Sequence, residues 1–265
     1  MSEVMIPPEL FAPVWNPKSY VDREGVEQIL ARLRRDYPLS KVEVPGYDPH
    51  WVVTKYKDVR EVSRLDNVFH SGDVSKSPVS KFAEQMMRQY SGGNPWVFRT
   101  LVHMDEPDHT AYRNVLKDLF MPQSISTLES MVREIVRRYI DNMAAKGPVC
   151  DFADEVAAPY PLEVICTLLG LPKEDHQDML RLTQWFLSYA DPDLCRPGSD
   201  LNNPEHQVAT WQIVYDKIKA YYDPIIEARR AQPTNDVASL IANGKVNGRL
   251  MDERELVSYY TIAST

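Results

Sequence analysis

The stretch MDEPDHTAYR (residues 104–113) decides the fold, because it predicts the start of a helix that carries two polar side chains on one face. Pro107 suits the first turn of a helix, and Asp105 suits the cap before it. His109 and Arg113 are then one turn apart and share a face. Together they present hydrogen-bond donors suited to a carboxylate or a phosphate. The spacing alone favours a simpler interpretation, a local cap partner at His109 and a solvated charge at Arg113, because polar pairs of this spacing are common.

Length and composition limit the number of domains and the classes of partner that the chain can have. The chain has 265 residues, of which 43% are hydrophobic, so it can form one large domain or two ordinary ones. Its formal net charge of −8 argues against a general nucleic-acid binder. The N-terminus lacks the basic and apolar regions of a signal peptide, and no apolar stretch is long enough to span a bilayer. We therefore expect a cytoplasmic protein with no membrane or nucleic-acid partner.

The cysteines give no sign of a disulfide or a metal site. Cys150, Cys166 and Cys195 are odd in number and widely separated, so they form neither a disulfide framework nor a C-x-x-C metal motif. We expect three reduced thiols that pack as small hydrophobic side chains.

The first hundred residues mix short helices with one hairpin. Residues 42–44 and 51–54 alternate as two strands, and residues 45–49 form the turn between them. Most of residues 67–102 is expected to be irregular. The hydrophobic spacing predicts helices over residues 25–35, 57–65 and 81–89.

From Pro107 onward the chain is predicted to be almost wholly helical. A long amphipathic helix covers Leu128 to Met143 and ends near Lys146-Gly147-Pro148. Residues 162–169 are apolar nearly all round, which predicts a fully buried helix. Further helices are expected over residues 173–189, 204–231 and 236–242.

The last helix has a clear start and no stop signal. Asp252 and Glu255 form a capping-box pattern, and the helix continues to Thr265 without a glycine, a proline or a basic last turn. We therefore expect the sequence to be cut within a helix.

The motif M-D-x-P-x-H-T-x-x-R resembles the C-helix signature of bacterial cytochromes P450, in which the histidine and arginine hold a haem propionate. Residues 119–122 (LFMP) resemble the end of that helix, and residues 252–257 resemble the start of the central I helix. The resemblance implies a mainly α fold, a helical prism with a small N-terminal β-sheet. Residues 1–265 would then be the N-terminal part of a single domain, cut within the I helix. Further matches point to the monoterpene-hydroxylating branch: Ser91-Gly92-Gly93, Tyr160-Pro161-Leu162, Tyr259-Tyr260 and Ile262-Ala263.

The resemblance implies haem b as the cofactor, with His109 and Arg113 at a propionate. The cysteine thiolate that binds the iron and the oxygen-activating residues would lie beyond residue 265, so no catalytic residue or metal ligand is expected in the chain itself. A thiolate-ligated haem favours O–O cleavage. The implied function is hydroxylation of a compact apolar substrate, a monoterpene or an alkyl-aromatic, with O₂. Electrons would come from a [2Fe-2S] ferredoxin and its ferredoxin reductase, and Lys117 is a candidate for a basic docking face.

The resemblance also places a substrate pocket along three segments: the loop before the C helix, the lid helix and the I helix. Aromatic and apolar side chains there suit an apolar substrate. Taken alone, each residue of the loop and the lid helix is more often ordinary packing, and Ile262 fits core packing equally well. The predicted pocket residues are Trp96, Val97, Phe98, Trp185, Phe186, Ile262 and Thr265.

Two other functions stay open at this point. A natural chain that ended at Thr265 would be a haem-free helical binding or regulatory module, and the intact protein would show no Soret absorption. A haem-thiolate enzyme that uses peroxide would need no ferredoxin. The sequence after Thr265 would distinguish these possibilities.

Overall fold

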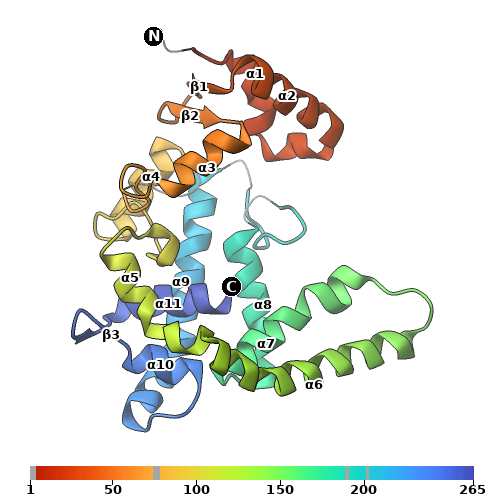
Figure 1. Ribbon diagram of the computed structural model, residues 1–265, viewed down its shortest axis with the longest axis vertical. Coiled ribbons are helices and arrows are strands. Elements are labelled where there is room, and N and C mark those ends of the chain that lie inside the picture. Colours follow the sequence, from red (N-terminus) through yellow and green to blue (C-terminus); the bar gives the residue numbers. More distant parts are fainter. Residues whose placement is uncertain (1–3, 74–77, 189–190, 201–202) are drawn as a thin grey trace. The chain divides into compact units, whose positions relative to one another are not determined.

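Helices dominate the chain, as predicted (Figure 1). The computed structural model describes residues 4–73, 78–188, 191–200 and 203–265. The chain divides into two units, Met1–Trp96 and Val97–Thr265, which are described separately. None of the helices within the described ranges combines the length and the hydrophobicity needed to span a bilayer.

The first unit is a small helical layer on a two-stranded sheet. Its core gathers around the buried side chains of Ile6, Phe11, Leu33 and Val42. The Asp22 and Ser80 side chains cap the helices that follow them, as their positions before helical segments favour. Its elements are α1 (Pro8–Trp15), the 3-10 helix η1 (Pro17–Val21), α2 (Arg23–Asp36), β1 (Leu39–Val42), β2 (His50–Val53), α3 (Tyr56–Arg64) and α4 (Lys81–Tyr90).

The hairpin is present, but its first strand lies earlier than the predicted residues 42–44. β1 and β2 are antiparallel, with Val42 opposite His50. The carbonyl of Val44 accepts a hydrogen bond from the amide of Tyr47 at 3.0 Å, so the turn already begins at Val44. Pro45 has no N–H to give to a ladder, and the prediction of a strand reaching Val44 is therefore wrong.

The second unit contains the long helices. Helix α9 has the predicted bounds, and the helices predicted at residues 81–89 in the first unit and 236–242 here are confirmed within one residue. The predicted end of the helix over residues 173–189 lies outside the described residues. The elements of this unit are η2 (Leu101–His103), α5 (Asp108–Arg113), η3 (Asn114–Phe120), α6 (Pro122–Lys146), η4 (Ala153–Ala157), α7 (Pro159–Leu169), η5 (Lys173–Asp175), α8 (His176–Leu187), α9 (Pro204–Ala231), α10 (Val237–Asn243), β3 (Lys245–Val246), β4 (Arg249–Leu250) and α11 (Glu253–Ser264).

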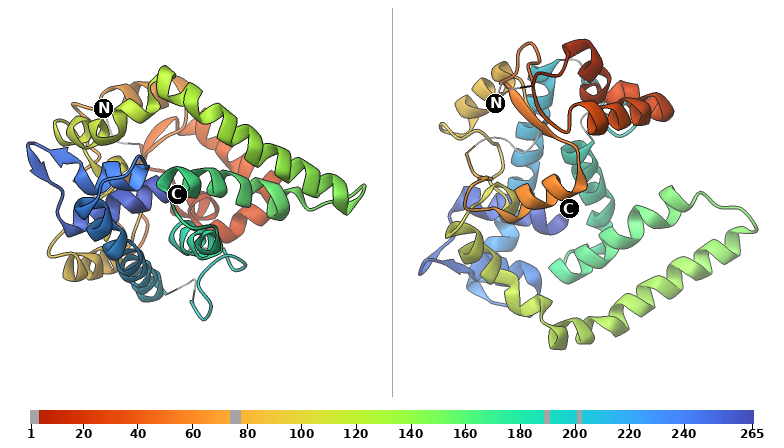
Figure 2. Two further views of the ribbon diagram at one scale, coloured as in Figure 1. Left: turned by 90° about the horizontal axis from the view of Figure 1, so that it is seen from below. Right: turned by 45° about the horizontal axis from the view of Figure 1, so that its top comes forward.

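Helices α6 and α7 form an arm in which α7 returns beside α6 (Figure 2). The prediction that α7 is buried all round is wrong. Leu162, Cys166 and Leu169 are buried, but Thr167 is exposed and Glu163 pairs with Arg138 of α6. The face of α7 that carries Glu163 therefore contacts a charged side chain of α6 instead of an apolar core. All three cysteines are free, and burial raises the pKa of the Cys166 thiol to about 12.

Helix α11 lies in the core of this unit and packs against α9 and α10. The Tyr260 ring stacks on that of Tyr222 of α9, with ring centroids 4.1 Å apart. The predicted capping box is confirmed: the Asp252 side chain accepts from the Glu255 amide, and the Glu255 side chain accepts from the Asp252 amide. The short hairpin β3–β4 before this helix was not predicted.

Candidate cofactor site

Helix α5 places His109 and Arg113 one turn apart on one face, as the sequence predicts. The helix begins at Asp108, so Pro107 occupies the cap position rather than the first turn. Asp105 contributes its backbone carbonyl, which accepts from the His109 amide at 2.9 Å. The backbone carbonyl of Asp105 thus takes part in the helix entry, where the Glu106 carboxylate also accepts from the Thr110 amide at 3.4 Å.

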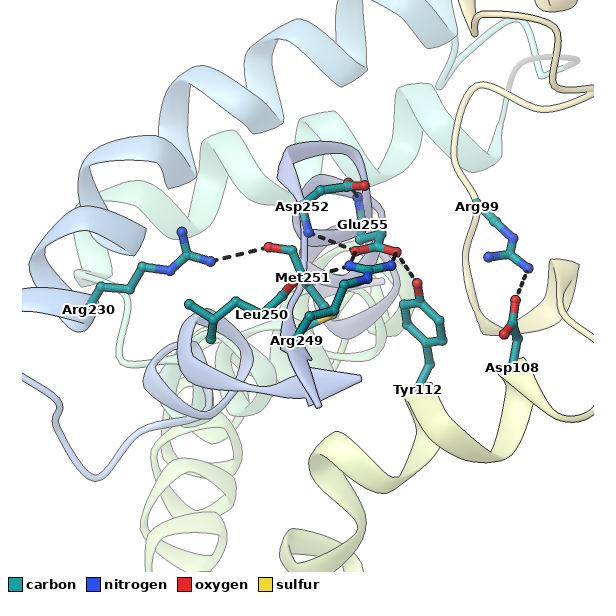
Figure 3. Close-up of polar contacts among 9 residues, drawn as sticks. All are labelled: Arg99, Asp108, Tyr112, Arg230, Arg249, Leu250, Met251, Asp252 and Glu255. Atoms are coloured by element: carbon teal, nitrogen blue, oxygen red, sulfur yellow. Dashed lines mark hydrogen bonds and ion pairs between the residues drawn. The ribbon is translucent and has the colours of Figure 1, made fainter. Parts of the chain in front are cut away.

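Charged and polar side chains on the other face of α5 form hydrogen bonds to residues outside the helix (Figure 3). Asp108 accepts from the Arg99 guanidinium at 2.6 Å, and the backbone amide of Arg99 donates to Ser258 Oγ of α11 at 3.0 Å. The Tyr112 hydroxyl donates to the carboxylate of Glu255, also on α11. Asp108 and Tyr112 are again one turn apart, so both polar residues on this face of the short helix bind residues outside it.

Glu255 is the centre of this network. Its two carboxylate oxygens accept from the Arg249 guanidinium, at 2.6 Å each, and one of them also accepts from the Asp252 amide at 2.7 Å. Partial burial alone would raise the pKa of Glu255, but hydrogen bonds from Arg249 and Tyr112 outweigh burial and lower the pKa to about 2. Burial and the Glu255 carboxylate together raise the pKa of Tyr112 to about 12. The network therefore keeps Glu255 ionised and Tyr112 neutral.

The short hairpin supplies Arg249 to this network. Asn247 and Gly248 have positive φ angles of 52° and 81°, as a tight two-residue hairpin turn requires. The turn brings β4 back along β3, and Arg249 of β4 then reaches Glu255. The carbonyl of Met251, just after β4, accepts from Arg230 of α9 at 3.3 Å.

A cavity of about 610 Å³ lies beside α5 and α11. This volume falls within the range of about 300–1,000 Å³ typical of small-molecule and cofactor sites. Arg113 and Ile262 both border it, so the structure brings together one predicted propionate ligand and one predicted pocket residue. The other lining residues are Leu101, Thr110, Asn114, Leu116, Lys117, Phe120, Met121, Tyr259 and Ala263.

The Arg113 side chain is exposed at this cavity. Among the residues that the structure describes, no hydrogen bond or ion pair involves its guanidinium. Arg99 and Arg249, by contrast, each bind a carboxylate. Arg113 is thus a cation without a protein partner in the described chain, next to a mainly apolar wall.

His109 is oriented differently from Arg113. Its Nδ1 lies 3.4 Å from a carboxylate oxygen of Glu106, and it is not among the described residues that border the cavity. The Thr110 hydroxyl donates to the same carboxylate at 2.6 Å. These contacts, the Thr110 hydrogen bond first, lower the pKa of Glu106.

The other predicted pocket residues are placed as follows. The buried Phe98 ring packs against Phe186 of α8, at a centroid distance of 5.0 Å, and against Tyr215 of α9, at 5.6 Å. Neither Phe98 nor Phe186 borders the cavity described above. Val97 is buried, Trp185 is partly buried, the exposed Thr265 follows α11, and Trp96 is the last residue of the first unit.

No protein-family model matches the chain. Over 260 residues, however, the chain is 32% identical to cytochrome P450-terp of a Pseudomonas species, covering 98% of this chain and 61% of that protein. The crystal structure of CYP108D1 from Novosphingobium aromaticivorans superposes with a TM-score of 0.82 at 32% identity, over 98% of this chain and 60% of that one. The chain is therefore similar over nearly its whole length to cytochromes P450. Another relative, linalool 8-monooxygenase of Pseudomonas putida, is 26% identical and is matched over 58% of its length by 93% of this chain.

The predicted cytochrome P450 fold is thereby confirmed, and the chain spans about three fifths of the length of these relatives. Cytochromes P450 hold a haem whose iron is bound by a cysteine thiolate. The cavity fits such a group, because it combines apolar walls for a ring face with an uncommitted guanidinium for a carboxylate. The Arg113 guanidinium has the planar fork of donors that suits a carboxylate.

Sequence reasoning did not identify the network around Glu255. Tyr112 and Glu255 are 143 residues apart, and no local pattern links them. For Arg249 a signal existed, because Asn247-Gly248 is a strong hairpin signature. Glu255 itself was recognised only as part of the helix cap.

Proposed function

We propose that the protein containing this chain is a haem-dependent monooxygenase. It would hydroxylate a compact apolar molecule, a monoterpene or an alkyl-aromatic, with O₂ and with electrons from a [2Fe-2S] ferredoxin and its ferredoxin reductase. The observation that carries the proposal is the position of Arg113, an uncommitted cation beside the apolar wall that α11 contributes to the cavity. A cytoplasmic location suits such a system.

Arg113 would bind a haem propionate through its guanidinium, whose planar fork matches a carboxylate. His109, on the same face of α5, would add a hydrogen bond once its imidazole turned from Glu106. When bound, a thiolate-ligated haem supplies the chemistry that cleaves O–O bonds. The residues of this chain would hold and orient the cofactor without taking part in bond making.

The apolar side chains would exclude water and select the substrate. Ile262 and Ala263 of α11 present hydrocarbon to the cavity. The Phe98–Phe186 pair supports an apolar substrate region, since aromatic rings line many small-molecule pockets. Trp96, Val97, Trp185 and Thr265 stay predicted contributors to the same pocket. The names of two relatives, cytochrome P450-terp and linalool 8-monooxygenase, favour a terpene-sized substrate.

Lys117 is the proposed contact for the electron donor. It is exposed and lies one turn beyond Arg113 in sequence, within η3. Ferredoxins are acidic, so a lysine on this surface would favour docking by charge complementarity. The net charge of −8 makes such a local cation more significant for orienting the partner.

The test is a spectral titration of the full-length, haem-loaded protein that contains this chain. Linalool and p-cymene serve as compact probes, and a steroid sulfate serves as the large charged control. We expect the compact probes to shift the haem from low to high spin and the control to leave it unchanged. Product formation with ferredoxin and reductase, but not with peroxide alone, would support the electron source. A response to the steroid sulfate only would overturn the substrate class.

A further inference from the structure

Tyr259 and Tyr260 are neighbouring tyrosines of α11 whose hydroxyls reach different elements. The Tyr259 hydroxyl donates to the backbone carbonyl of Tyr112 in α5 at 2.9 Å. The Tyr260 hydroxyl donates to the backbone carbonyl of Ala238 in α10 at 2.7 Å. The two side chains are 4% and 0% exposed. They therefore make the same kind of buried hydrogen bond, but only Tyr259 makes it to the helix that carries Arg113.

Tyr112 is held by α11 at two points. Its hydroxyl donates to Glu255, and its carbonyl accepts from Tyr259. That carbonyl belongs to the planar peptide unit that joins Tyr112 to Arg113. A hydrogen bond to it restrains the plane of the peptide from which Arg113 continues.

This restraint matters because the helix is short at this point. Helix α5 ends at Arg113, and the chain continues as the 3-10 helix η3. The hydrogen-bond geometry of 3-10 helices is poorer than that of α-helices, so the helix alone holds Arg113 weakly. The bonds from α11 supply the additional restraint.

We infer that Tyr259 is a positioning residue, which holds Arg113 in its orientation toward the cavity through the Tyr112 carbonyl. The inference rests on the proposed role of Arg113 at a haem carboxylate. The Tyr259 ring also borders the cavity, but the inference concerns its hydroxyl alone. Replacing Tyr259 with phenylalanine keeps the ring in place and removes only the hydrogen bond to α5.

The experiment compares Tyr259→Phe with Tyr260→Phe in the full-length, haem-loaded protein. The rate of haem release to an excess of apomyoglobin is measured together with the midpoint of thermal unfolding. Each variant loses one buried hydrogen bond, so we expect similar decreases in the midpoint. Tyr259→Phe should speed haem release by about three- to tenfold, whereas Tyr260→Phe should change it by less than about twofold.

Arg113→Ala completes the design. It should speed haem release by about ten- to a hundredfold, and adding Tyr259→Phe to it should have no further effect. A full additional effect in the Arg113→Ala background would show that Tyr259 acts on the cavity directly, and equal effects of the two tyrosine variants would show general loosening. Either result overturns the inference.

The two proposals fail in different ways. If Arg113→Ala leaves haem release unchanged, the proposed role of Arg113 is wrong and the inference falls with it. If Arg113→Ala speeds release but Tyr259→Phe behaves like Tyr260→Phe, only the positioning role is wrong.

Discussion

The two faces of α5 use the same spacing for different purposes. Asp108 and Tyr112 are one turn apart and are both bound to other elements, by Arg99 and Glu255. His109 and Arg113 have the same separation, but Arg113 lies exposed at the cavity and His109 lies near Glu106 at its own helix entry. The engaged face, with Asp108 and Tyr112, holds the helix in place. The free face, with His109 and Arg113, presents hydrogen-bond donors.

This difference explains how a short helix can serve as a ligand site. A helix of six residues gains little stability from its own hydrogen bonds, so tertiary contacts must fix it. The engaged face supplies these contacts through α11 and leaves Arg113 free to bind a ligand. Mutations on the two faces should therefore have separable effects, on stability for one and on haem retention for the other.

The largest effect is expected at Glu255, the centre of the engaged face. Glu255→Ala removes the acceptor for Tyr112, Arg249 and the Asp252 amide from a side chain that is 13% exposed. Since it leaves polar partners unsatisfied, it should lower the free energy of unfolding by about 2–4 kcal/mol. Urea denaturation of the full-length protein measures this change. Glu253→Ala is the matched control, because Glu253 is an exposed acid on the same helix and its loss should cost less than about 0.5 kcal/mol.

The contribution of Glu255 to the free energy of unfolding should also depend on pH. The pKa of Glu255 lies at about 2, below its ordinary 4.5, so its stabilising effect is fully present above pH 4.5 and is lost as the pH falls toward 2. The stability difference between the wild type and Glu255→Gln should therefore shrink across this interval. A difference that does not change with pH would contradict the role given to the carboxylate.

The engaged face is also where prediction from sequence reaches its limit. Helix α9 and the start of α11 could be predicted because periodicity and caps are local signals. The motif on α5 was recognisable for the same reason. The hydrogen bond between Tyr112 and Glu255 joins residues 143 positions apart, and nothing in the sequence around either residue specifies its partner. The strands of the β3–β4 hairpin have two residues each, too short to show alternation.

The second largest effect should follow from Arg113→Ala on the free face. Losing a charge-assisted hydrogen bond to a carboxylate costs about 1.5–3 kcal/mol, which corresponds to roughly ten- to hundredfold weaker haem retention. The haem-free protein should unfold as the wild type does, because Arg113 is exposed and binds no described residue. Haem transfer to apomyoglobin and urea denaturation measure the two quantities.

Lys117→Ala is the control for this prediction. Lys117 borders the same cavity and is also exposed, but it lies one turn further along the chain. Its removal should change haem retention by less than about twofold, since an exposed ammonium on a flexible side chain gives a carboxylate no fixed bidentate contact. Equal losses in both variants would indicate a general effect of positive charge at the cavity rather than a specific bond from Arg113.

The smallest effect is expected for His109→Ala. A neutral imidazole can give one hydrogen bond and no charge, so its loss should weaken haem retention by about two- to fivefold, or about 0.5–1 kcal/mol. The effect is further limited because His109 Nδ1 lies 3.4 Å from Glu106, which competes for the same donor. Glu106→Gln removes that competing charge and should leave haem retention equal to the wild type or stronger, while His109→Ala should cancel any gain. If His109→Ala weakens haem retention as much as Arg113→Ala does, the imidazole is an equal partner, and the free face works as a pair rather than through Arg113 alone.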